Sequence, residues 1–197
     1  MAASTERDKK LIQYLNEAYG KEKELEAALQ AHIGMTDRPP YKKRLRKHLT
    51  ETKGHARSLE RRIKALGGSP ATTQRLAGQA TAALKGSLHA VRAGGTEEML
   101  LKNAKTEYSE EAEEIATYTA IEAFAENVGD QQTAKLARGI RREEERMASY
   151  LERLIPQLAR AVVRAQVPSG ERSRRRRATR GRTRKPARTP TSRSRRR

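Results

Sequence analysis

The 197-residue chain contains no cysteine, no tryptophan and a single phenylalanine. The absence of cysteine excludes disulfides, thiolate metal ligands and cysteine nucleophiles. No apolar run approaches the roughly 18 residues of a membrane-spanning helix, and residues 1–10 lack the hydrophobic stretch of a secretory signal. We therefore expect a cytoplasmic protein without a membrane span.

Signals for common enzyme chemistry are also missing. The sequence has no glycine-rich phosphate loop and no evident pairing of a nucleophile with a base, so hydrolase and transferase activities have no support. What the chain does contain is much Ala, Leu, Glu, Lys and Arg. This composition is typical of long amphipathic helices and not of a sheet.

Apolar residues recur with the 3.6-residue period of a helix in four segments, at about 5–33, 40–66, 96–128 and from 131 onward. In the third segment we expect Tyr108 to face inward, and in the fourth we expect Pro156 to kink or end the helix. A shorter segment, 71–92, is interpreted as a helical crossover. The sequence thus predicts an all-α protein in which two antiparallel hairpins form a four-helix bundle.

Four glutamates interrupt the apolar stripes, one in each long segment. Glu22 lies 15 residues before the centre of the first turn, and Glu51 lies 14 residues after it. Glu114 and Glu144 lie at similar distances on either side of the second turn. Equal distances from the turn of an antiparallel hairpin mean equal heights, so each hairpin should place two carboxylates at one level.

Converging carboxylates cannot all stay ionised in a core, because each uncompensated buried charge costs several kcal/mol. Two iron or manganese ions would offset four negative charges, as in di-metal carboxylate bundles. His55, one turn after Glu51, could add an imidazole ligand. The alternative is that His48 and His55 are half-buried residues bonded to a carbonyl or a glutamate, and that each glutamate reaches solvent at a helix boundary.

Motifs within residues 8–158 carry a family resemblance. They are Tyr19-Gly-Lys-Glu-Lys-Glu-Leu25, His48-Leu-Thr-Glu-Thr-Lys-Gly-His55, Glu114-Ile-Ala-Thr-Tyr118 with Ala125-Glu-Asn-Val-Gly129, and Glu143-Glu-Glu-Arg-Met147. In this order they resemble the YciE/YciF-type ferritin-like family of bacteria. The resemblance implies a ferritin-like four-helix bundle, association into a homodimer, and metal-ligand positions at Glu22, Glu51, Glu114 and Glu144.

The sequence also departs from the ferritin-like pattern of Glu-x-x-His on two helices. His55 follows Glu51 by four residues, and Met147 stands three residues after Glu144. The site is therefore either rich in carboxylates or lost, in which case the bundle is purely structural. Glu143 is an alternative to Glu144 as the ligand from the fourth helix.

Positive charge is concentrated near the C-terminus. Of the net charge of +19, residues 171–197 hold +13, which leaves +6 for the other 170 residues. Residues 169–197 lack large apolar side chains, so we expect a disordered tail after a bundle domain at 1–168. Guanidinium groups match phosphate geometry, and without aromatic residues to stack on bases the tail should bind DNA or RNA non-specifically. The candidate nucleic-acid-binding residues are Arg172, Arg174, Arg175, Arg176, Arg177, Arg180, Arg182, Arg184, Lys185, Arg188, Arg193, Arg195, Arg196 and Arg197.

Three functions are compatible with these features. The leading hypothesis is a ferritin-like stress-response protein with a di-iron site that consumes peroxide or oxygen, tethered to nucleic acid and associated with the nucleoid by its tail. The second is a metal-free helical module that coats or compacts nucleic acid. The third is a purely structural homodimer. For the tail alone, acidic partners, membrane lipids or mere solubility are the alternatives.

Overall fold

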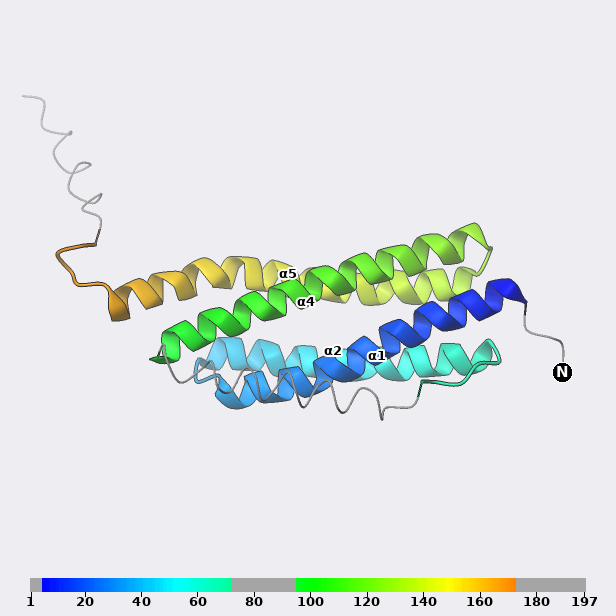
Figure 1. Ribbon diagram of the computed structural model, residues 1–197, viewed down its shortest axis with the longest axis horizontal. Helices are drawn as coiled ribbons and strands as arrows, with labels where there is room; N and C mark the ends of the chain where they lie inside the picture. Colours follow the sequence, from blue (N-terminus) through cyan, green and yellow to red (C-terminus); the bar gives the residue numbers. More distant parts are fainter. Residues whose placement is uncertain (1–4, 72–94, 173–197) are drawn as a thin grey trace, which may run out of the picture.

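The computed structural model describes residues 5–71 and 95–172, which form four long α-helices without any strand (Figure 1). The helices are α1 (Glu6–Met35), α2 (Pro39–Ala65), α4 (Gly95–Asn127) and α5 (Gln131–Gln166). The predicted all-α architecture is confirmed. The expected crossover helix and the arginine-rich tail lie outside the described residues, except for residue 71 of the crossover and residues 169–172 of the tail.

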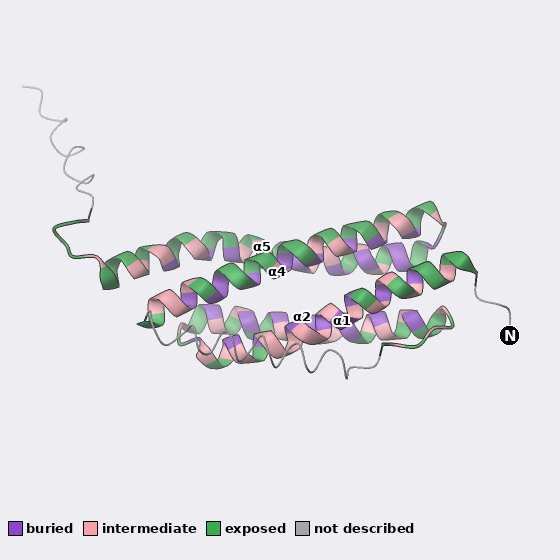
Figure 2. Cartoon of the chain, viewed as in Figure 1, coloured by how far each residue is buried: buried purple, intermediate pink, exposed green. Residues whose placement is uncertain are grey.

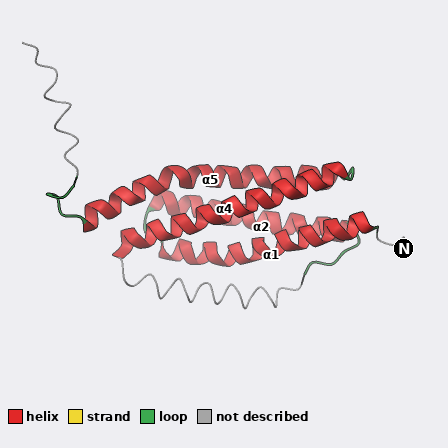
Figure 3. Ribbon diagram, turned by 45° about the horizontal axis from the view of Figure 1, so that its top comes forward, coloured by secondary structure: helices red, strands yellow, loops and turns green. Residues whose placement is uncertain are grey.

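The helices form two antiparallel hairpins that pack side by side. α1 pairs with α2, α4 pairs with α5, and the hairpins meet through contacts of α1 with α4 and of α2 with α5 (Figures 1 and 3). The two short turns lie at opposite ends of the bundle. Each helix therefore has two neighbours and one face toward the common interior.

Side-chain caps fix where the helices begin. The Thr5 hydroxyl accepts a hydrogen bond from the Asp8 backbone N–H at 3.2 Å, and the Asp130 carboxylate accepts one from the Thr133 N–H at 3.0 Å. Such bonds satisfy N–H groups that have no partner within the helix. Before Asp130, Gly129 adopts a φ of +77°, a conformation that costs glycine little. Gly129 and Asp130 together therefore specify the turn between α4 and α5.

Helix α5 passes through Pro156 and does not end there. Leu154 and Leu158, on either side of the proline, are buried against the other helices, whereas Pro156 itself is exposed. Packing of these leucines offsets the backbone hydrogen bond that a proline cannot donate. The helix continues to Gln166, where Arg172 donates to the carbonyls of Val167 and Arg164, each at 2.7 Å.

A buried polar layer divides the interior into two apolar regions. Figure 2 shows buried residues along the inward faces of all four helices. One apolar cluster contains Leu29, Tyr41, Leu45, Met147 and Leu151. The other, toward the opposite end, contains Leu15, Leu59, Ile63, Tyr118 and Ile121. On every helix at least one buried glutamate or histidine lies between these clusters, and on α4 the buried residues there are Glu107, Glu111 and Glu114.

The prediction that Tyr108 faces inward on α4 is wrong. This side chain is 38% exposed, and its neighbour Glu107 is buried instead, paired with His32 of α1. Within the described part of the chain, none of the helices is apolar over a stretch long enough to cross a bilayer.

Candidate metal centre

Six ionisable residues meet in the polar layer, and every helix contributes at least one. All are almost completely buried. They are Glu22 from α1, His48 and His55 from α2, Glu111 and Glu114 from α4, and Glu144 from α5.

Helical periodicity explains why these side chains converge. Glu111 and Glu114 are three residues apart, and His48 and His55 are seven apart, so each pair projects from one face of its helix. On α4 the buried positions from Leu100 to Ala125, apart from Asn103, repeat at alternating intervals of four and three residues. The two glutamates occupy two of these inward positions, in place of apolar residues.

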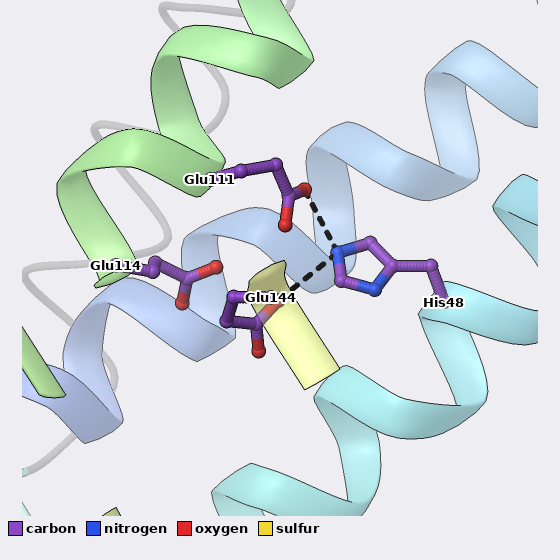
Figure 4. A group of neighbouring side chains, drawn as sticks. All are labelled: His48, Glu111, Glu114 and Glu144. Atoms are coloured by element: carbon purple, nitrogen blue, oxygen red, sulfur yellow. Dashed lines mark ion pairs between the residues drawn. The ribbon is translucent and has the colours of Figure 1, made fainter. Parts of the chain in front are cut away.

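One group of possible ligands surrounds His48 (Figure 4). The Nε2 atom of His48 lies 2.9 Å from Glu111 Oε1 and 3.5 Å from Glu144 Oε2. Glu114 completes the group, in which one ligand atom from each of the four residues lies within 4.8 Å of the others. This spacing suits a single metal ion.

A second group lies beside the first and shares one member with it. The Nδ1 atom of His55 lies 2.9 Å from Glu144 Oε1 and 3.3 Å from Glu22 Oε1. These three residues also offer ligand atoms within 4.8 Å of one another. The two oxygens of Glu144 therefore face different histidines, which is the arrangement of a carboxylate that bridges two ions.

Four of the five residues predicted as ligands are brought together: Glu22, His55, Glu114 and Glu144. Glu51 lies outside both groups. Its carboxylate contacts Arg44 at 2.9 Å and Lys47 at 3.3 Å, and it lies 3.4 Å from the Nδ1 atom of His48. Glu51 therefore contacts the ring nitrogen of His48 that is turned away from the cluster.

The alternative ligand from the fourth helix, Glu143, lies at the edge of the site. Its side chain is 35% exposed and its Oε2 atom lies 2.9 Å from His55 Nε2. Its neighbour Glu144 is fully buried and belongs to both groups. The geometry therefore favours Glu144 as the central carboxylate, with Glu143 holding the outer nitrogen of the imidazole.

Sequence reasoning missed His48 and Glu111 as candidate ligands. Both fall on the inward stripes, and the spacing Glu111-x-x-Glu114 places two carboxylates one turn apart on one face. The search for one glutamate per helix at matching heights passed over that spacing. It also preferred Glu51 to the histidine one turn earlier.

The charges in the cluster are strongly coupled. Burial, reinforced by Glu22 and Glu144, raises the pKa of Glu114 well above 4.5, and burial raises the pKa of Glu111 to about 8 although His48 opposes it. Glu144 behaves differently, because its close contact with His55 and the positive charges of both histidines outweigh burial and lower its pKa.

The histidines are held in their charged forms by their acidic neighbours. Burial lowers the pKa of His48, but hydrogen bonds to Glu111 and Glu51 outweigh it and raise the pKa to about 10. For His55, the nearby carboxylates of Glu144 and Glu22 outweigh burial in the same way and raise the pKa to about 11. At neutral pH, two imidazolium groups thus flank Glu144 and favour the ionised form of its carboxylate.

Many polar atoms in this layer have no hydrogen-bond partner among the described residues. They include both oxygens of Glu114, both oxygens of Glu144, and one oxygen each of Glu22 and Glu111. The Nδ1 atom of His55 is also without one, because its 2.9 Å approach to Glu144 lacks hydrogen-bond geometry. Buried polar atoms are normally paired, and imidazole and carboxylate donors suit iron and manganese. The residues therefore fit a pair of such ions.

A groove between α2 and α5 leads to the second group. It has a volume of about 630 Å³, and its lining combines small or polar residues, such as Thr50 and Gly54, with the apolar side chains of Leu136 and Ile140. His55 and Glu143 also line it. Solvent and small molecules can thus approach the cluster at His55.

Tyr118 fixes the position of Glu22. Its hydroxyl donates a hydrogen bond to Glu22 Oε1, and the tyrosine itself is buried in the apolar cluster next to the polar layer. A carboxylate held in this way has one oxygen directed by the protein and the other left for a ligand.

The fold and the buried layer of carboxylates and histidines define a ferritin-like four-helix bundle. Residues 6–164 match the family described as "Domain of unknown function (DUF892)". The chain belongs to this family, and the likeness to the YciE/YciF type predicted from the four motifs is confirmed.

Solved structures share the fold at low sequence identity. A protein from Xanthomonas campestris superposes with a TM-score of 0.67 at 24% identity, over 82% of this chain and 98% of that one. The Escherichia coli stress protein YciF gives 0.64 at 20% identity, over 78% and 97%. Bacterioferritin from Desulfovibrio desulfuricans, described with a diiron site, gives 0.63 at 20% identity, over 81% and 86%. The ferritin-like bundle is therefore common to all of them.

Proposed function

We propose that the bundle holds two metal ions, iron in the first place, on either side of Glu144. Glu22 and His55 would complete one ligand set, and His48, Glu111 and Glu114 the other. The observation that carries this proposal is that the two oxygens of Glu144 face different histidines. The diiron site named for the related bacterioferritin supports iron.

Two other residues would hold these ligands in position. Glu51, first predicted as a ligand itself, is suited to orient His48 through its Nδ1 atom, and Tyr118 orients Glu22. Two bound iron ions would supply electrons for the reduction of peroxide or oxygen. The apolar clusters at both ends exclude water, so a small oxidant would enter by the groove at His55.

We further propose that the protein acts in the cytoplasm in a stress response, a role supported by the name of its E. coli relative. The arginine-rich segment 169–197, which follows a bundle domain at 1–168, would tether it to nucleic acid and to the nucleoid. Association into a homodimer is proposed from the likeness to the family alone.

Metal analysis tests the central proposal. Protein purified without chelator and reconstituted anaerobically with Fe(II) or Mn(II) should retain two ions per chain after desalting. Retention of less than about one ion would contradict a di-metal site. Consumption of peroxide by the loaded protein then tests the redox role separately.

A metal-free module that binds nucleic acid is the second candidate. It is favoured by the charge state of the cluster, because protonated His48 and His55 already offset the charge of Glu144. This function predicts that Fe(II) and Mn(II) leave the thermal stability unchanged, while the protein still retards DNA in a gel. A rise in Tm with metal would exclude it.

A further inference from the structure

The charges of the four helices are sorted between two faces of the bundle. α2 has ten Lys and Arg against two acidic residues, and α5 has eight against four. In contrast, α4 has two basic against nine acidic residues, and α1 has five against six. Because α2 packs beside α5, the face they form is strongly positive.

On α5 the basic residues form a straight row. Their successive intervals are 7, 4, 7, 7 and 4 residues, which at about 100° per residue keeps all of them within about 20° of one line. The row is about 43 Å long at about 1.5 Å per residue. We call it the α5 basic row; it consists of Lys135, Arg142, Arg146, Arg153, Arg160 and Arg164, all exposed.

The charge of this row is largely uncompensated within the described residues. There, only Arg146 has an acidic partner, Glu143 at 3.2 Å. Arg138 and Arg141, on the side of α5 that faces α4, behave differently, since they pair with Glu122 at 2.6 and 3.1 Å. Neutralised arginines thus face α4, while the row keeps its charge for an external partner.

The row borders a groove whose opposite wall is also basic. Between α2 and α5 lies a hollow of about 600 Å³, lined by Arg44 and Lys47 of α2 and by Arg142, Arg146 and Arg153 of α5. Glu51 partly offsets the charge of the α2 wall, because it pairs with Arg44 at 2.9 Å and with Lys47 at 3.3 Å. A second hollow of about 630 Å³ between the same helices is lined by Lys135, but also by Glu51 and Glu143, so the first hollow is the better site for phosphates. Five of the eight residues that line the first hollow are Lys or Arg against one glutamate, and its one aromatic lining residue, Tyr150, is only partly exposed.

We propose that the α2/α5 face binds the backbone of double-stranded DNA without regard to sequence. A rigid row about 43 Å long spans a little more than one duplex turn of about 34 Å, and a duplex offers it a phosphate charge every 1.7 Å or so. A lipid surface is a poorer match, because Val163 is the one large apolar side chain of the described α5 that is well exposed. The inference extends the proposed tether from the C-terminal segment to the folded bundle and does not depend on the metal site.

Full-length protein and a labelled random-sequence DNA duplex provide the test. The double variant R142Q/R153Q removes two charges from the row, and K102Q/K105Q removes two exposed, unpaired charges from α4 as the matched control. The row variant should weaken binding roughly tenfold near physiological salt and reduce the slope of log K against log salt by about 1.8, while the control changes K less than about twofold. The variant R142K/R153K, which keeps the charge, should bind as the parent does.

Equal losses for the row variant and the α4 control would overturn the inference, because binding would then follow net charge alone. A further variant with Arg174–Arg177 replaced by glutamine tests the tail separately. If only this variant loses affinity, the tail tether stands and the row does not; the reverse result retains the row alone. Vesicles of phosphatidylserine test for a membrane partner. If the protein binds them more tightly than it binds the duplex, and R142Q/R153Q weakens the binding to vesicles, the inference is overturned in favour of a membrane partner.

Discussion

His48 of α2 and Glu111 of α4 face each other across the bundle interior, with Nε2 and Oε1 2.9 Å apart. Both are buried, and both neighbour the shared carboxylate of Glu144. This contact joins the two helical hairpins at the polar layer. It also means that the candidate site needs both hairpins, because neither supplies a complete ligand set.

The variant E144Q should disrupt both proposed ion sites at once. An amide oxygen is a weaker ligand than a carboxylate, and only one end of the amide offers oxygen, so the two ions lose their common bridge. We expect the bound metal to fall from two ions per chain to less than one after desalting, as measured by elemental analysis. The control E145Q, which changes a neighbouring glutamate that pairs with Arg141 and belongs to neither group, should retain two ions. Equal losses in both variants would refute the special place of Glu144.

The variant E114Q should stabilise the metal-free protein. Because burial and the nearby carboxylates raise the pKa of Glu114, the folded state holds a proton that the unfolded state releases above about pH 4.5. The free energy of unfolding of the metal-free protein therefore falls as the pH rises from about 4.5 toward the pKa of Glu114 in the folded state. Glutamine does not titrate, so we expect a gain of about 1–3 kcal/mol in unfolding free energy at neutral pH.

Urea denaturation with chelator present, from about pH 5 to pH 8, measures this effect. E113Q is the control, since Glu113 is exposed and paired only with Lys21; it should change stability by less than about 0.5 kcal/mol. The same E114Q protein should lose its stabilisation by metal. A metal-free E114Q that is less stable than the parent would show that the carboxyl contributes a favourable interaction.

Metal binding should release protons. Histidine binds metal as the neutral base, but the pKa values of His48 and His55, about 10 and 11, keep both protonated at neutral pH. Each ion must therefore displace at least one proton, and affinity should rise with pH toward these values. Calorimetric titration in buffers of different ionisation enthalpy should give about two protons or more per chain. A heat independent of the buffer would contradict this charge state.

The long helices could be predicted from the sequence, because periodic apolar residues and turn signals are local features. Within the site, counting residues from each turn gave the height of a side chain but not its rotation about the helix axis. His48 and Glu51 differ by one turn and about 60° of rotation, and that difference places the histidine inward and Glu51 against Arg44. On α4, the sequence prediction places Glu111 and Glu114 on the inward stripe, but it places Tyr108 there in preference to Glu107, which is buried beside His32.

Asp130 should contribute measurably to stability through the second turn. Its carboxylate caps α5 and accepts a hydrogen bond from Arg62 of α2 at 2.6 Å. D130A removes both interactions, so we expect a loss of about 1–3 kcal/mol in unfolding free energy, measured by urea denaturation. D37A, in the exposed first turn, is the control and should stay within about 0.5 kcal/mol of the parent. Similar losses in both variants would indicate a general effect of removing acidic residues.

Anomalous X-ray diffraction from crystals of the reconstituted protein tests the central claim most directly. Data collected at the iron or manganese edge should show two peaks in the polar layer, one beside His48 and one beside His55, with the carboxylate of Glu144 between them. Absence of anomalous density from this layer in crystals grown with excess metal would contradict the di-metal account.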